Sequence, residues 1–115
     1  MSSNVNMVRA SELFIQLAPY FSTLYSSSER FFFSYPVPHP SVHPGEHRGW
    51  WASLAPTGDG FVLHTACGVR SCRGIWLDRS LLPDEAQEVN REHQAFLRQL
   101  EAICHQQGWP LIRRG

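Results

Sequence analysis

The sequence predicts an α+β fold in which two helices pack on one face of an antiparallel sheet of about four strands. Both ends of the chain show helical periodicity, whereas the middle carries apolar runs separated by turn residues. With 115 residues the chain is long enough for one core, so we expect a single domain over residues 1–115. The expected order is α-β-β-β-β-α, followed by a short C-terminal strand.

The first helix is predicted over residues 9–27, after a flexible segment at residues 1–8. Its apolar side chains, among them Leu13 and Leu17, recur at spacings that place them on one helical face. Pro19 interrupts this pattern because it lacks a backbone donor. We therefore expect the helix to kink near residue 18.

An aromatic strand is predicted next, at Arg30–Val37, with alternate side chains on the same face. Pro36 and Pro38 are expected to end its pairing because proline cannot donate to a strand ladder. Residues 38–49 then show neither the helical nor the strand periodicity of apolar residues, and their prolines and glycines predict a loop of about a dozen residues.

Two hairpins are predicted in the middle of the chain. Trp50–Ala55 and Phe61–Cys67 are apolar runs joined by the turn residues 56–60. Cys67 and Cys72 flank a second expected turn, after which Gly74–Asp78 returns as another strand. Four strands in this arrangement make an antiparallel meander.

Strand alternation leaves two candidate core faces. The first set is Trp50, Leu54, Phe61, Leu63, Ile75 and Leu77. The second set is Trp51, Val62, His64, Ala66 and Trp76. Both sets are largely apolar, so we expect a partner or the 38–49 loop to cover the face that the helices leave open.

The last helix is predicted to begin at Pro83, where proline and two acidic residues favour a helix start. Gly108 is a natural C-cap, and a short edge strand is predicted at Leu111–Arg113. The apolar stripe of this helix includes His93 and Cys104, which we interpret as core residues.

The charge balance argues against two classes of partner. Ten arginines balance ten acidic residues and lysine is absent, so the chain has no net charge. Without an excess positive field, we expect no nucleic-acid and no membrane partner. No run of 18 apolar residues and no leader pattern occurs, which predicts a cytoplasmic protein with reduced thiols.

Histidines and cysteines are concentrated between His39 and Cys72. Zinc would need four ligands, for which the candidates are Cys67, Cys72, His39 and His43. However, the prolines around these histidines disfavour a helix, and alternation along a strand separates His64 from Cys67. We therefore predict no cofactor and no metal, and keep zinc as the alternative.

The surplus of aromatic residues predicts a non-enzymatic module that acts through protein–protein contacts with a partner or through self-association as a homodimer. Aromatic and arginine side chains are enriched at interfaces, and no catalytic motif occurs. The predicted contact residues are Trp50, Trp51, His43, His47, Arg48 and Trp76. An adaptor, an inhibitor or an immunity-type accessory protein of a bacterium or phage fits this prediction. The alternative is a metal- or small-ligand-binding protein, or an enzyme, that uses the region from His39 to Cys72.

Overall fold

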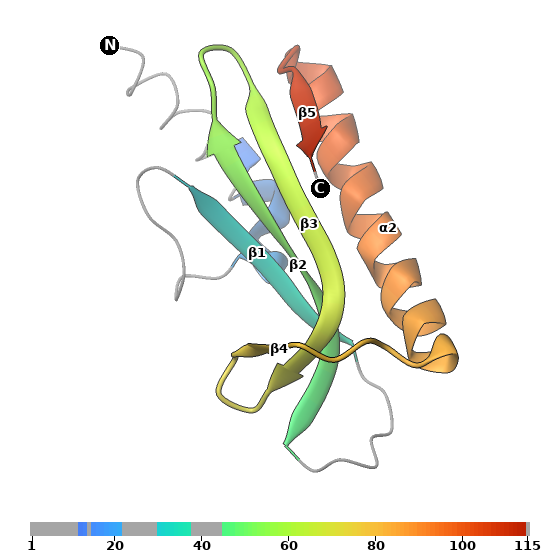
Figure 1. Cartoon of the computed structure of the whole chain (residues 1–115). Helices are drawn as coiled ribbons and strands as arrows, with labels where there is room; N and C mark the ends of the chain where they lie inside the picture. Colours follow the sequence, from blue (N-terminus) through green and yellow to red (C-terminus); the bar gives the residue numbers. More distant parts are fainter. Residues whose placement is uncertain (1–11, 14, 22–29, 38–44, 115) are drawn as a thin grey trace.

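The structure is a computed structural model that describes residues 12–13, 15–21, 30–37 and 45–114. In these ranges a mixed α+β fold forms, with a five-stranded sheet and helical segments on one of its faces (Figure 1). The elements are η1 (Ala18–Tyr20), β1 (Phe31–Val37), β2 (Glu46–Pro56), β3 (Phe61–Ser71), β4 (Trp76–Leu77), α2 (Pro83–Gln107) and β5 (Leu111–Arg114). The predicted fold class is confirmed.

The N-terminal helix is described in part. Residues 12, 13 and 15–17 are helical, and the 3-10 helix η1 follows directly. The geometry therefore changes at Ala18, next to Pro19, where the sequence predicts a kink. The remaining parts of the predicted helix and the predicted flexible segment at residues 1–8 lie outside the described residues.

Strand β1 lies at one edge of the sheet, which is ordered β1-β2-β3-β4. Its pairing with β2 continues through Pro36 to Val37, so the prediction that Pro36 ends the pairing was wrong. Proline is tolerated there because one side of an edge strand needs no ladder partner. Pro38 lies outside the described residues.

Strands β2 and β3 are longer than the sequence predicts. β2 begins at Glu46, so the last four residues of the predicted 38–49 loop are strand. β3 continues to Ser71, because Glu46 to Gly49 supply antiparallel partners for Gly68 to Ser71. The predicted turn between Cys67 and Cys72 was therefore wrong, and the actual turn is closed by the Ser71 N–H donating to the Ile75 carbonyl at 2.8 Å.

The other edge of β3 pairs with two short strands. β4 pairs antiparallel with its C-terminal end, at Val69 and Arg70. β5 pairs parallel with its N-terminal end, from Phe61 to His64, after the chain returns along α2. The short C-terminal strand is thus present, and it makes the sheet mixed at this edge.

Helix α2 covers one face of the sheet, as Figure 1 shows from its position beside β3 and β5. It begins at Pro83 and ends at Gly108, whose φ of 74° is the left-handed C-cap conformation that glycine adopts without steric cost. Its buried stripe packs on the same core as Leu13 and Leu17. The buried residues of the stripe are Glu85, Val89, His93, Phe96, Leu97, Leu100, Ile103 and Cys104.

The sheet face that packs on the helices carries most of the first predicted core set. Trp50, Leu54, Phe61 and Leu63 are fully buried there. Ile75 and Leu77 are 58% and 36% exposed, so their assignment to the core was wrong. The reason is that Ile75 lies in the turn before β4 and that β4 has only two residues.

Candidate functional site

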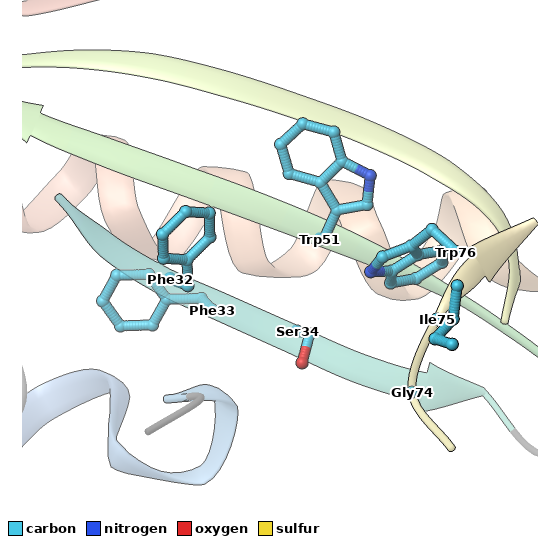
Figure 2. A pocket seen from close by; sticks show the side chains of 7 residues that line it. All are labelled: Phe32, Phe33, Ser34, Trp51, Gly74, Ile75 and Trp76. Carbon is cyan, nitrogen blue, oxygen red and sulfur yellow. The ribbon is translucent and has the colours of Figure 1, made fainter. Parts of the chain in front are cut away.

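The sheet face opposite α2 carries an aromatic groove of about 410 Å³. Trp51 from β2, Phe32 from β1 and Trp76 from β4 are its aromatic side chains, and all three are partly exposed. Figure 2 shows these rings on one face of the sheet, with α2 behind it. The lining residues are Phe32, Phe33, Ser34, Trp51, Gly74, Ile75 and Trp76.

Glycines allow the Trp76 wall of this groove to lie close to the sheet. Gly49 and Gly68 are cross-strand partners on β2 and β3. A Cβ atom added at Gly68 would lie 3.6 Å from the Trp76 ring, so this ring packs directly over the glycine backbone. Gly74, with a φ of 85°, lets the chain turn before β4. Gly68 and Gly74 therefore allow Trp76 to lie close to the sheet, where it forms one wall of the groove.

A positively charged hollow of about 350 Å³ adjoins the aromatic groove and shares Gly74 with it. Its lining residues are Pro36, His47, Arg70, Ser71, Cys72, Arg73 and Gly74. The set includes two arginines and no carboxylate. The Arg70 guanidinium lies 5.8 Å from the centroid of the Trp76 ring, a distance at which cation–π attraction orients it. Apolar and positively charged surfaces thus meet at Trp76.

The structure brings together three of the predicted contact residues. Trp51 and Trp76 line the aromatic groove, and His47 lines the adjoining hollow. Trp50 has no exposed surface, and Arg48 is 2% exposed. Both belong to the helix-facing register of β2, so we leave them out of the contact surface. His43 lies outside the described residues.

The zinc alternative gains no site from the described part of the chain. No group of three or more histidine, cysteine, aspartate or glutamate side chains that could hold a metal occurs there. Cys67 lies within β3 and Cys72 follows the end of the same strand, so they do not face each other across a hairpin as predicted. His39 and His43 lie outside the described ranges.

Several groove residues were missed from the sequence. Phe32 stands between two core residues of β1 and must point to the opposite face, a signal already present in the alternation of Phe31, Phe32 and Phe33. Arg70 and Arg73 were not singled out because their positions depend on the length of β3. Because the sequence predicted a turn at these positions, neither arginine could be assigned to a face of the sheet.

A comparison with models of protein families matches residues 1–112 to one family, described as sigma factor-binding transcriptional regulator Crl. The chain belongs to the Crl family. The match includes β1 to β4, α2 and the first two residues of β5, and so includes both sides of the groove. A search of curated proteins finds no match to this chain.

Membership of the Crl family implies a protein-binding, non-enzymatic role, in agreement with the coarser prediction of a binding module. It corrects the exclusion of nucleic acid, because a transcriptional regulator acts on a process whose template is DNA. The zero net charge was the wrong criterion, since a protein that joins such a complex through another protein needs no positive field of its own. The described part of the chain contains no helix long and apolar enough to cross a membrane.

Proposed function

We propose that this Crl-family protein binds a sigma factor through the open face of its sheet. The observation that carries the proposal is the pair Trp51 and Trp76, two partly exposed tryptophans in one groove of a chain whose family is described as sigma factor-binding. Tryptophan is the residue most enriched among those that dominate binding energy. Desolvation of the groove by a partner would supply the main favourable free energy.

The positively charged hollow beside Trp76 would determine which way round the sigma factor binds. Arg70 and Arg73 attract carboxylates, whereas the aromatic groove accepts apolar side chains. We infer that the bound surface of the sigma factor carries apolar side chains next to acidic ones. The acidic residues would lie toward the β3–β4 turn.

The proposal places the protein in the cytoplasm of a bacterium, where sigma factors direct transcription. A role as an adaptor fits better than inhibition or immunity, since the family description names a regulator that binds the sigma factor itself. The groove offers no cluster of catalytic groups, and binding alone accounts for its composition.

The test is the affinity of the full chain for purified sigma factors, measured by titration calorimetry. We expect Trp51→Ala and Trp76→Ala each to raise the dissociation constant by about 30-fold or more, the size of effect typical of a dominant contact. Ile112→Ala is the matched control, because Ile112 is an exposed apolar residue on β5, away from the groove. It should change the dissociation constant by less than about twofold.

Two results would overturn the proposal. One is the absence of binding to every sigma factor of the source cell. The other is unchanged affinity of both tryptophan variants while their circular dichroism spectra stay native. Light scattering measures the molar mass of the free protein. A dimer that is lost in the tryptophan variants would show that a second copy of the chain, rather than a sigma factor, covers the open face.

A further inference from the structure

On the helix-facing side of the sheet, three polar side chains lie in a row between β3 and α2. Cys67 Sγ is 3.2 Å from His93 Nδ1, and Thr65 Oγ1 is 2.6 Å from His93 Nε2. Cys67 and Thr65 are two residues apart on β3, so both point toward α2. His93 is 7% exposed, whereas Cys67 is partly exposed. Cys67 is therefore the more accessible member of the pair.

The hydrogen bonds around Thr65 fix where the protons lie. The Thr65 hydroxyl donates its only proton to the Trp51 carbonyl, at 2.7 Å. His93 Nε2 must then carry a hydrogen and donate it to Thr65 Oγ1. In this tautomer Nδ1 has no hydrogen, so the single Cys67 S–H has two acceptors, His93 Nδ1 at 3.2 Å and Asn90 Oδ1 at 3.4 Å, and the imidazole nitrogen is the nearer and the more basic. Cys67 is thus a thiol held against a free base.

The resting pair is neutral. Burial raises the pKa of the Cys67 thiol and lowers the pKa of His93, which Arg113 on β5 lowers further. The resting side chain of Cys67 is therefore the thiol and not the thiolate. Instead the proton moves to Nδ1 only while the sulfur attacks an electrophile, as in general-base catalysis.

We propose that Cys67 is a modification site at which His93 promotes oxidation of the thiol by a hydroperoxide. Two potential ligands are too few for a zinc site, so metal binding does not explain the pair. The Sγ atom also lies 3.4 Å from Asn90 Oδ1 at the exposed side of the pair. Cys67 is partly exposed, and a hydroperoxide is small enough to approach it from the side of Asn90.

The oxidation is balanced without any further reactant. The sulfur attacks the outer oxygen of the hydroperoxide, an S–O bond forms and the O–O bond breaks. The thiol proton passes to His93 Nδ1 and then to the departing alkoxide or hydroxide. Sulfur loses two electrons, and the products are a sulfenic acid at Cys67 and an alcohol or water.

The chain contains its own reference thiols for the test. Cys72 is exposed, and among the described residues no histidine forms a hydrogen bond with it, whereas Cys104 is 2% exposed with a pKa raised to about 11 by burial and by Glu101. The full protein is treated at pH 7 with limiting hydrogen peroxide, and sulfenic acids are trapped with a cyclic 1,3-dione. Mass spectrometry of the peptides gives the rate at each cysteine. We expect Cys67 to react at least about fivefold faster than Cys72 despite its lower exposure and raised pKa, because His93 Nδ1 can take up the thiol proton during the attack.

The decisive variant is His93→Gln, which removes the base. We expect the rate at Cys67 to fall by about tenfold or more and the rate at Cys72 to stay the same. Asn90→Ala is the matched control, because it changes the other neighbour of the sulfur and should alter the rate by less than about threefold. A native circular dichroism spectrum with an unchanged Cys67 rate in His93→Gln would overturn the proposal. If that variant does not fold, the wild-type ratio decides alone, and a Cys67 rate equal to or below that of Cys72 overturns the proposal.

Discussion

Arg48 on β2 and Glu85 on α2 form an ion pair inside the protein, where each residue is 2% exposed. The second oxygen of Glu85 accepts the backbone N–H of Leu82 at 2.9 Å, so the same carboxylate holds the start of the helix. Glu46 lies 3.8 Å from Arg48 and accepts a hydrogen bond from Arg79 at 2.9 Å. The ion pair therefore joins the first residues of β2 to the first turn of α2.

Removing one member of this pair should destabilise the fold strongly. In Arg48→Met the Glu85 carboxylate stays buried without its cation, which costs about 3–5 kcal/mol in the free energy of unfolding. Urea denaturation measures this loss. Glu85→Leu should cost a similar amount, because the buried guanidinium loses its Glu85 partner and the Leu82 N–H loses its acceptor.

The double variant Arg48→Met/Glu85→Leu is the control for coupling between the two residues. Because it removes both charges of the pair together, its loss of unfolding free energy should be smaller than the sum of the two single losses. Strict additivity would show that the ion pair is not the source of the effect.

Stability should fall in two steps as the solution becomes acidic. Burial and Arg113 lower the pKa of His93 in the folded state, and Cys67 faces the ring from β3. The unfolded chain therefore binds this proton first, near the ordinary value of 6.5, and stability is lost as the pH falls from there through the lowered folded pKa.

Glu85 produces the second step. Burial opposes its charge, but the Leu82 N–H and Arg48 outweigh this and hold its pKa below the ordinary 4.5. Its contribution is complete above pH 4.5 and is lost as the pH falls through the folded pKa. Urea midpoints measured from pH 7 to pH 3 should show both steps. The variant His93→Gln should lack only the first step. If the first step persisted in this variant, His93 would be excluded as its cause.

Periodicity predicted the fold because the helices and strands bury regular apolar patterns. Both ends of α2, at Pro83 and Gly108, carry local signals that tertiary contacts do not overrule. The alternation in β2 and β3 likewise predicted which residues share a face with Trp50 and which with Trp51. These features need no knowledge of long-range contacts.

The missed features depend on contacts between distant residues. Arg48 appeared to be a surface cation, because the sequence does not show that Glu85 faces it across 37 residues. In the same way, Cys67 was interpreted with Cys72 as a zinc candidate and His93 as a core residue, although the packing of α2 on β3 places their atoms in contact. The length of β3 was underestimated because Gly68 and Ser71 are typical turn residues that here pair with the start of β2.

Gly60 should tolerate no side chain. It lies at the turn between β2 and β3, and a Cβ atom there would overlap the backbone carbonyl of Pro110, which accepts the Phe61 N–H at 2.9 Å. Gly60→Ala should therefore lower the unfolding free energy by about 1–3 kcal/mol, because β5 must move away from β3. Gly58→Ala is the matched control in the same turn, since no atom lies within 4 Å of its added Cβ. It should leave stability unchanged or raise it by up to about 1 kcal/mol.

The positively charged hollow should affect the rate of sigma factor binding more than the aromatic groove does. Arg73 is exposed at the rim beside Arg70, where a charge acts on the approaching partner before contact is made. Arg73→Glu should lower the association rate constant by about tenfold at low salt, and this difference should shrink as the salt concentration rises. Stopped-flow fluorescence measures both. Arg98→Glu changes the net charge by the same amount on the exposed surface of α2, and a loss as large as that of Arg73→Glu would show that total charge, not the hollow, steers the partner.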